Sequence, residues 1–252
     1  MTTSRAAHWE ARYASVDRLW SGRPNDWLPE LAGDWEPGAG LDIGCGEGAD
    51  TLWLAERGWR VTAVDLSPTA IDRLRREAAR RGLDQQVSAL VQDGGQGLPE
   101  GPFDLVTCFY VHGGPEEGGL RLGDLLADAA GRVAPGGHLL VAVHAINPPW
   151  HTHHARTYTA AELLEEIGES VAGWQTVVAE ERWREATGPQ GQAGRRADAV
   201  LCLRRPGSRP AGEGGATARA VGVESAASAV PAEPEARAHP GEPGEAAPSG
   251  PA

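Results

Sequence analysis

Apolar and polar positions along the first 205 residues predict strands and helices in turn. Short apolar runs bounded by turn residues indicate buried strands, and segments with helical spacing separate them. Such alternation predicts a Rossmann-like, doubly wound α/β fold, with helices on both faces of a seven-stranded, mostly parallel sheet. The expected strands are 40–43, 59–64, 87–91, 103–111, 138–144, 171–184 and 197–204, and the last two are expected to form an antiparallel edge hairpin.

Capping residues set the ends of several expected helices. Ser67 followed by Pro68 predicts the start of a helix, and Gly82 predicts its end. Thr159 and Glu162 have the spacing of a capping box. The expected helices are 8–20, 49–57, 68–81, 120–133 and 160–168.

Three parts are expected along the chain. Of the 47 residues in 206–252, 29 are Ala, Gly or Pro, and none is aromatic, Leu or Ile. Such a segment buries too little apolar surface to offset its ordering entropy, so it is predicted to be a disordered tail. Residues 39–205 are the right length for one α/β domain, and residues 1–38 are predicted to form a helical lid over it.

The charge of the chain narrows its possible partners. There are 35 acidic residues against 23 basic ones, a net charge of −12, and every basic residue is arginine. An acidic protein is a poor match for nucleic acid, so no nucleic-acid partner is expected. The absence of lysine excludes a P-loop, a protein kinase and Schiff-base chemistry. On the expected helix 68–81, Glu77 is predicted to pair with Arg73 and Arg81, four residues to either side.

Cysteine usage and hydropathy suggest the compartment. The three cysteines are scattered, the N-terminus has no apolar leader, and no apolar stretch approaches 18 residues. These features predict a cytoplasmic protein with reduced thiols and no membrane partner. The sequence does not indicate an oligomeric state.

A glycine-rich turn carries the candidate chemistry. Gly44, Gly46 and Gly48 lie between the expected strand 40–43 and the helix that follows it. Glycines allow a tight turn and a close approach of the backbone to a ligand, and the helix N-terminus offers unpaired N–H groups. Asp65 and Asp93 end the next two strands, at the edge of the sheet where α/β proteins bind ligands.

Two cofactors fit this arrangement. Gly44, Gly46 and Ala49 satisfy the dinucleotide pattern GxGxxG/A, which favours an NAD-dependent oxidoreductase. Asp42, however, puts a carboxylate two residues before the first glycine, where a pyrophosphate needs no anion. A cationic ligand without phosphates, such as S-adenosylmethionine, would favour that carboxylate and the strand-end acid Asp93.

The motifs DIGCGEG, VTAVDLS, VQDGG, FDLVTCFYV and PGGHLLVAV occur in this order. The series resembles that of class I S-adenosylmethionine-dependent methyltransferases, over about residues 9–205. The flanking blocks WEARY, WSGRPN and YTAAELLEEIG are similar to those of bacterial small-molecule methyltransferases of the tellurite-resistance and thiopurine type.

The resemblance implies roles for particular residues. The methionine portion of the cofactor would be held by Asp42 and the 44–48 turn, which includes Cys45. The ribose and adenine would be held by Asp65, Leu66, Asp93 and Gly94, with Phe109 as a wall. The substrate and lid residues would be Trp20, Arg23, Asn25 and Trp150.

Histidines supply the candidate bases. His112 and His144 follow the fourth and fifth expected strands, so either could act as a general base or line the pocket. The loop histidines His151, His153 and His154 lack the spacing of a zinc site, and no metal is expected. The expected reaction is in-line methyl transfer to a small-molecule acceptor, with a thiol or chalcogen oxyanion favoured and a base needed for a hydroxyl or amine. A non-catalytic member of the fold that binds cofactor or a partner stays open.

Overall fold

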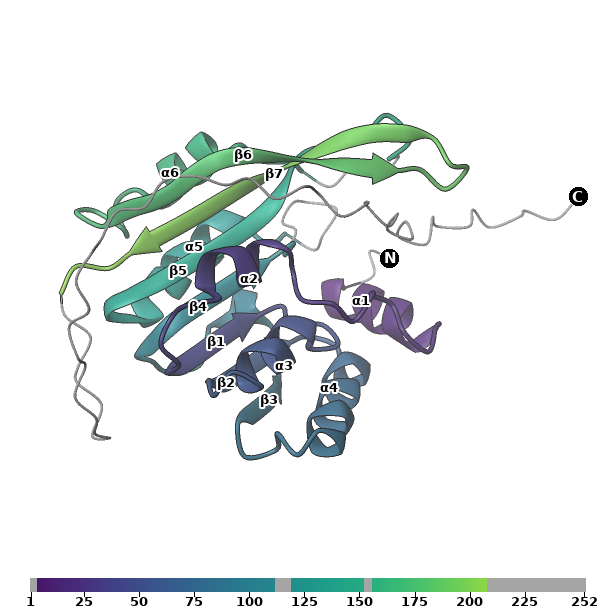
Figure 1. Cartoon of the computed structure of the whole chain (residues 1–252), viewed down its shortest axis with the longest axis horizontal. Helices are drawn as coiled ribbons and strands as arrows, with labels where there is room; N and C mark the ends of the chain where they lie inside the picture. Colours follow the sequence, from purple (N-terminus) through teal and green to yellow (C-terminus); the bar gives the residue numbers. More distant parts are fainter. Residues whose placement is uncertain (1–3, 112–118, 152–155, 208–252) are drawn as a thin grey trace, which may run out of the picture.

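The computed structural model describes residues 4–111, 119–151 and 156–207 and contains one seven-stranded sheet in the order β3-β2-β1-β4-β5-β7-β6 (Figure 1). Strands β1 to β5 are parallel, and β7 runs antiparallel between β5 and β6. The predicted fold class is therefore confirmed. The strands are β1 Ala39–Ile43, β2 Arg60–Asp65, β3 Val87–Val91, β4 Phe103–Phe109, β5 Val133–Ile146, β6 Gln175–Thr187 and β7 Ala193–Arg204.

Helices cover both faces of the sheet (Figure 1). Side chains of α2 and α3 share one apolar cluster with β1's neighbours β2 and β4, and α4 packs beside them. The opposite face is covered by α5 and α6. The helices are α1 Arg5–Ala14, α2 Trp27–Ala32, α3 Ala49–Ala55, α4 Pro68–Arg80, α5 Leu122–Arg132 and α6 Ala160–Ile167, with a 3₁₀ turn η1 at Gly94–Gln96.

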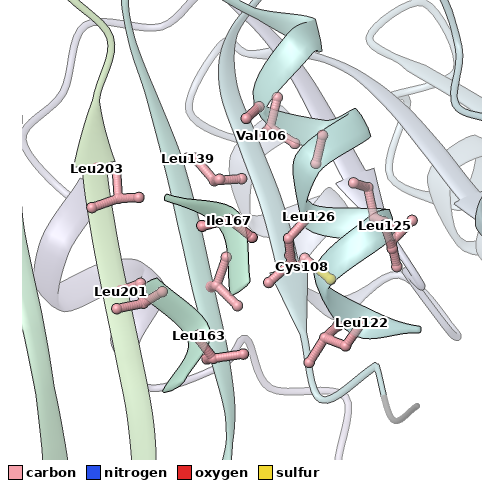
Figure 2. Packing of buried hydrophobic residues seen from close by; sticks show 14 of the residues in the cluster. Val106, Cys108, Leu122, Leu125, Leu126, Leu139, Leu163, Ile167, Leu201 and Leu203 are labelled. Atoms are coloured by element: carbon pink, nitrogen blue, oxygen red, sulfur yellow. The ribbon is translucent and has the colours of Figure 1, made fainter. Parts of the chain in front are cut away.

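The largest apolar cluster lies under α5 and α6 (Figure 2). Leucines and isoleucine of these helices point onto the central strands, whose own side chains on this face are almost all aliphatic. Burial of such side chains, about 1.5–3 kcal/mol each, anchors the sheet. The residues of this cluster that are labelled in Figure 2 are Val106, Cys108, Leu122, Leu125, Leu126, Leu139, Leu163, Ile167, Leu201 and Leu203. This rigid layer holds the carboxyl ends of the strands, where the candidate site lies.

The predicted helix caps are present. The Ser67 hydroxyl accepts a hydrogen bond from the Ala70 amide at 3.1 Å, with Pro68 in the first helical turn. Thr159 and Glu162 form both bonds of a capping box. Both helices begin where their caps predict because the side-chain oxygens satisfy amides that have no helical partner.

One expectation about the N-terminal region was wrong, and one helix there was not predicted. The predicted helix 8–20 ends at Ala14, because the amides of Leu19 and Trp20 donate to the Glu47 carboxylate instead of to helical carbonyls. The six-residue helix α2 was not predicted, since it is shorter than one amphipathic repeat and contains a proline.

The predicted pairing of Arg73 with Glu77 was also wrong. Glu77 instead accepts hydrogen bonds from Arg80 and Arg81, which lower its pKa to about 2. Arg73 reaches away from α4 to Glu47, at 2.8 Å, and to backbone carbonyls of the N-terminal segment. The Arg81 pairing was predicted correctly.

The predicted tail 206–252 lies outside the described residues beyond Gly207. Among the residues that the structure describes, no helix is long and apolar enough to cross a membrane.

Candidate functional site

The glycine-rich turn between β1 and α3 has a backbone that other residues adopt with difficulty. Gly44, Gly46 and Gly48 have φ values of 70°, 53° and 84°. A Cβ at Gly44 would lie 2.4 Å from Val111 Cγ2, and one at Gly48 would lie 2.2 Å from a Leu74 methyl carbon. The turn therefore requires glycine for both conformation and space.

Asp65 at the end of β2 is tied to this turn. Its carboxylate accepts the Gly46 amide at 3.0 Å and the Ser67 amide at 2.9 Å. Burial raises the pKa of Asp65 to about 6, although the two amide hydrogen bonds oppose the shift. An acid held in this way keeps its remaining lone pairs directed at the cavity edge, where it can accept ligand hydroxyls.

Asp42 lies beneath the turn, fully buried. One carboxylate oxygen accepts the Thr51 hydroxyl at 2.6 Å, and the other accepts the Thr107 hydroxyl at 2.9 Å. Burial raises the pKa of Asp42 despite these hydrogen bonds. Asp42 therefore joins β1, α3 and β4 and positions the turn from below.

A third acid completes the group. Burial, assisted by the charge of Asp42, raises the pKa of Asp50 in the first turn of α3 to about 8. The Asn25 amide donates to Asp50 at 2.6 Å, which brings the N-terminal segment to the start of α3. The carboxyl groups of Asp42, Asp50 and Asp65 thus surround one short turn and resist ionising there.

A cavity opens beside the turn, at the carboxyl ends of β1, β2 and β3. Arg5 of α1 forms an ion pair with Asp93 at the rim of this cavity. Sequence reasoning missed Arg5, because nothing in its local pattern indicates so distant a partner. The lining includes Arg5, Ile43, Gly44, Val64, Asp65, Leu66, Asp93, Gly94, Val111, Leu120 and Leu125. The predicted residues Gly44, Asp65, Leu66, Asp93 and Gly94 are therefore brought together.

The N-terminal segment lies across the same edge. Glu10 of α1 accepts the hydroxyls of Ser67 and Thr69 at 2.6 Å each. The Trp20 indole donates to the Tyr13 hydroxyl at 3.0 Å, and a Cβ on Gly46 would lie 2.8 Å from that hydroxyl oxygen. Residues 4–20 thus pack directly over the glycine turn.

The remaining predicted residues have varied positions. Phe109 is buried in the apolar cluster with Trp27 and Leu140. Trp150 packs close to Gly188 and Gly194 of the β6–β7 hairpin. Arg23 is exposed. Burial raises the pKa of the Cys45 thiol well above its usual range. His112, His153 and His154 lie outside the described residues.

His144 belongs to a polar cluster that sequence reasoning missed. Asp198 of β7 is fully buried and accepts from His144 Nδ1 at 3.0 Å, Tyr110 at 2.9 Å and Arg184 at 2.9 Å. The Trp27 indole adds a longer bond at 3.3 Å. The available signal was Asp198 itself, a lone acid within the apolar run of residues 197–203.

Acidification is expected to weaken binding of a ligand whose hydroxyls bond to Asp65. The raised pKa means that Asp65 takes up a proton near pH 6 and then loses acceptor capacity. The affinity for S-adenosylhomocysteine should be level above pH 7 and fall by about tenfold per pH unit well below 6. Titration calorimetry across pH 5–8 measures this, and Asp65→Asn should abolish that slope.

The same shift acts on stability in the opposite direction. The folded state binds the Asp65 proton more tightly than the unfolded chain does. The contribution of Asp65 to the free energy of unfolding is therefore fully present below the ordinary aspartate pKa, and it is lost as pH rises through about 6. Weaker binding in acid therefore cannot be attributed to loss of this contribution to folding.

Residues 41–137 match the family model described as a methyltransferase domain. This match spans the glycine turn, Asp65, Asp93 and strands β1 to β4. This segment is a class I S-adenosylmethionine-dependent methyltransferase domain. Its cofactor is S-adenosylmethionine, and the resemblance found in the motif series is confirmed.

Curated relatives match parts of the chain. The methyltransferase is 38% identical over 103 residues to nodulation protein S of Rhizobium tropici, which covers 40% of each chain. The chain spans 40% of the length of nodulation protein S and 54% of the length of hemagglutinin 1 of Eikenella corrodens, another curated relative that it matches.

Solved structures share the fold. TehB from Haemophilus influenzae superposes with a TM-score of 0.60 at 18% identity, covering 80% of this chain and 67% of that one. Magnesium protoporphyrin IX methyltransferase from Synechocystis, solved with S-adenosylhomocysteine bound, has a TM-score of 0.52 at 19% identity and covers 71% and 78%. The antiparallel β7 between β5 and β6 also differs from the usual dinucleotide-binding order 3-2-1-4-5-6, so the NAD alternative gains no support.

Proposed function

We propose that this methyltransferase transfers the methyl group of S-adenosylmethionine to a small-molecule acceptor. The observation that carries the proposal is the cavity beside the glycine turn, lined by Gly44, Asp65, Leu66, Asp93 and Gly94. When bound there, the cofactor supplies an electrophilic methyl group on a sulfonium. The protein supplies alignment and exclusion of water.

Different residues of the cavity lining bind different parts of the cofactor. Asp65 accepts the ribose hydroxyls, and Leu66 packs on the adenine. Asp93 accepts the adenine amino group with the help of the Gly94 backbone, after the Arg5 guanidinium has moved from it. The 44–48 turn holds the methionine portion and leaves Asp42 beneath it as a support.

The acidic group under the turn favours a cationic ligand. The pKa values of Asp42, Asp50 and Asp65 are all raised, because burial and mutual repulsion disfavour their charges. An ammonium and a sulfonium beside them would relieve that repulsion, whereas a phosphate would increase it. This preference separates S-adenosylmethionine from a dinucleotide on physical grounds.

The N-terminal segment 1–38 acts as a lid and limits the acceptor to a small molecule. Glu10, Tyr13 and Trp20 hold its described part against α4 and the glycine turn. The Trp20 ring lies near enough to the turn to face a sulfonium, a cation–π contact worth about 0.5–2 kcal/mol. A macromolecular acceptor would have to displace this segment.

The test is release of S-adenosylhomocysteine from S-adenosylmethionine over a panel of thiols, tellurite, selenite, phenols and amines. Trp20→Ala should reduce turnover by about 3- to 30-fold, because it removes the contact to the sulfonium and the indole's hydrogen bond to Tyr13, which holds the lid. Trp183→Ala is the matched control, since Trp183 is 47% exposed on β6. Equal turnover in both variants would refute the lid role, and no product with any acceptor would refute the proposed function.

A further inference from the structure

A buried polar cluster lies beside the cofactor turn and is not needed to bind the cofactor. Its centre is Asp198, which is fully buried and receives donors from four different parts of the chain. Arg184 Nη2 also donates to the Tyr110 hydroxyl at 3.1 Å. Rings of Tyr110 and His144 lie 4.6 Å apart between centroids. Buried polar groups are costly unless they are hydrogen-bonded, and the members of this cluster satisfy one another.

The hydrogen bonds determine the form of His144. Burial disfavours the Asp198 charge, but hydrogen bonds from His144 and Tyr110 and the charge of Arg184 outweigh burial and lower its pKa. An ionised carboxylate is only an acceptor, so His144 Nδ1 must carry the proton in their 3.0 Å contact. In the neutral ring, Nε2 therefore holds the lone pair, as in a base oriented by an aspartate.

The strand register puts this base near the reacting end of the cofactor turn. Ile43 of β1 is level with Cys108 of β4, and the next β4 residue, Phe109, is level with Ala142 of β5. His144 lies two residues beyond Ala142, at the carboxyl edge of the sheet. With strands about 4.8 Å apart, β5 is roughly 10 Å from the glycine turn, a separation that suits a small acceptor between the two.

Two further contacts connect the cluster with the turn. The Asn25 amide donates to Asp50 in the first turn of α3, and the Asn25 side chain hydrogen-bonds Tyr110. Tyr110 has a φ of 51°, which makes it the only non-glycine residue with positive φ in the described part of the chain. Such strain persists where the surroundings enforce it, and it is concentrated at functional sites.

We propose that His144 is the general base of the methyl transfer, that Asp198 is its positioning residue, and that the acceptor is a small molecule with a hydroxyl nucleophile. This inference rests on the proposed function and refines its acceptor. The acceptor oxygen forms a bond to the methyl carbon while the carbon–sulfur bond breaks and its electron pair stays on sulfur. The hydroxyl proton passes to His144 Nε2, so the products are a methyl ether, S-adenosylhomocysteine and an imidazolium.

This base distinguishes acceptor classes. A thiolate or a chalcogen oxyanion is already deprotonated near neutral pH and gains little from His144. A hydroxyl with a high pKa depends on proton removal, which contributes about 10²- to 10⁴-fold to such reactions. The geometry therefore favours an oxygen acceptor over the thiol or oxyanion that the sequence favoured.

Charged and polar groups from several elements face His144. Asp198 on β7 contacts its Nδ1, and Arg184 on β6 pairs with the same carboxylate. The Tyr110 hydroxyl, whose pKa burial raises, is a neutral donor to Asp198. The ring of His151 lies 6.2 Å from that of His144 in an edge-to-face arrangement.

The decisive variant is His144→Gln, assayed by single turnover on a panel of phenols and aliphatic alcohols and on thiols and selenite. We expect wild-type turnover on hydroxyl acceptors, and a fall of about 10²- to 10⁴-fold in His144→Gln. S-adenosylhomocysteine affinity should change by less than about threefold, because His144 does not line the cofactor cavity. His138→Gln on the same strand is the matched control, since His138 stacks on Trp35 away from the cluster.

Asp198→Asn tests the positioning role. Its kcat on hydroxyl acceptors should fall, while its rate on thiols and selenite stays within about threefold of wild type, because only the hydroxyl reaction depends on how His144 is oriented. If Asp198→Asn fails to fold, the tautomer of His144 in the wild type is measured instead, by ¹⁵N–¹H correlation spectra. The inference predicts the Nδ1–H tautomer. An Nε2–H tautomer would overturn the inference.

The remaining outcomes are decisive too. Full hydroxyl turnover by His144→Gln, or wild-type turnover limited to thiols and oxyanions, would overturn the inference and leave the proposed function standing. Wild-type protein that binds S-adenosylhomocysteine but methylates no hydroxyl in the panel would also overturn it. Failure to bind S-adenosylhomocysteine would instead refute the proposed function.

Discussion

Replacing Asp65 with alanine is expected to weaken S-adenosylhomocysteine binding by about 10²- to 10⁴-fold. The carboxylate is proposed to accept two ribose hydroxyls, and hydrogen bonds to charged groups contribute about 1.5–3 kcal/mol each, or about 3–6 kcal/mol together. Asp65 also holds the Gly46 and Ser67 amides, so its loss relaxes the turn that meets the ligand. Titration calorimetry at pH 7.5 measures the change.

Asp84→Ala is the control for this variant. Asp84 is exposed in the turn after α4, where its carboxylate accepts a hydrogen bond from its neighbour Gln85 at 3.3 Å. Its affinity should equal that of the wild type. If Asp65→Ala bound S-adenosylhomocysteine within threefold of wild type, the ribose role of Asp65 would be wrong.

Replacing Asp42 with alanine is expected to lower the free energy of unfolding by about 2–4 kcal/mol. The change leaves the buried Thr51 hydroxyl without its Asp42 acceptor, at about 1–3 kcal/mol. The Thr107 hydroxyl loses its 2.9 Å bond to Asp42 and keeps a longer one to the Leu41 carbonyl at 3.3 Å, at about 0.5–1.5 kcal/mol. That loss is a large share of the 5–15 kcal/mol typical of a domain. Urea unfolding followed by tryptophan fluorescence measures it.

A surface acid provides the comparison. Asp72 on α4 is exposed and makes only a long ion pair with Arg75, at 3.4 Å, so Asp72→Ala should change stability by less than about 0.5 kcal/mol. An Asp42→Ala variant as stable as Asp72→Ala would show that Asp42 does not support the turn. It would return Asp42 to the role that the sequence suggested, a direct ligand of the methionine portion.

Much of the fold could be predicted because its signals are local. Ser67, Pro68 and the Thr159–Glu162 box determine helix starts through contacts three residues away or less. Strand runs such as 87–91 are apolar and end at turn residues, and the structure has that strand with the same bounds. The glycine turn was predictable for the same reason, since its positive φ values need glycine wherever the chain folds this way.

The parts that could not be predicted depend on contacts between distant segments. Arg5 and Asp93 are 88 residues apart, and His144 and Asp198 are 54 residues apart, so neither pair leaves a periodic pattern. Arg73 illustrates the conflict directly. Its spacing favoured Glu77, but Glu47 and the Tyr13 carbonyl of the N-terminal segment provide partly buried acceptors. Helical spacing predicts neighbours only when no tertiary partner competes.

Titration of the wild-type chain with S-adenosylhomocysteine at pH 7.5, in parallel with NAD, tests the central claim most directly. The account predicts saturable binding of one S-adenosylhomocysteine per chain, protection of the fold against heat by that ligand, and no heat of binding from NAD. No saturable binding of S-adenosylhomocysteine, or protection by NAD alone, would contradict it.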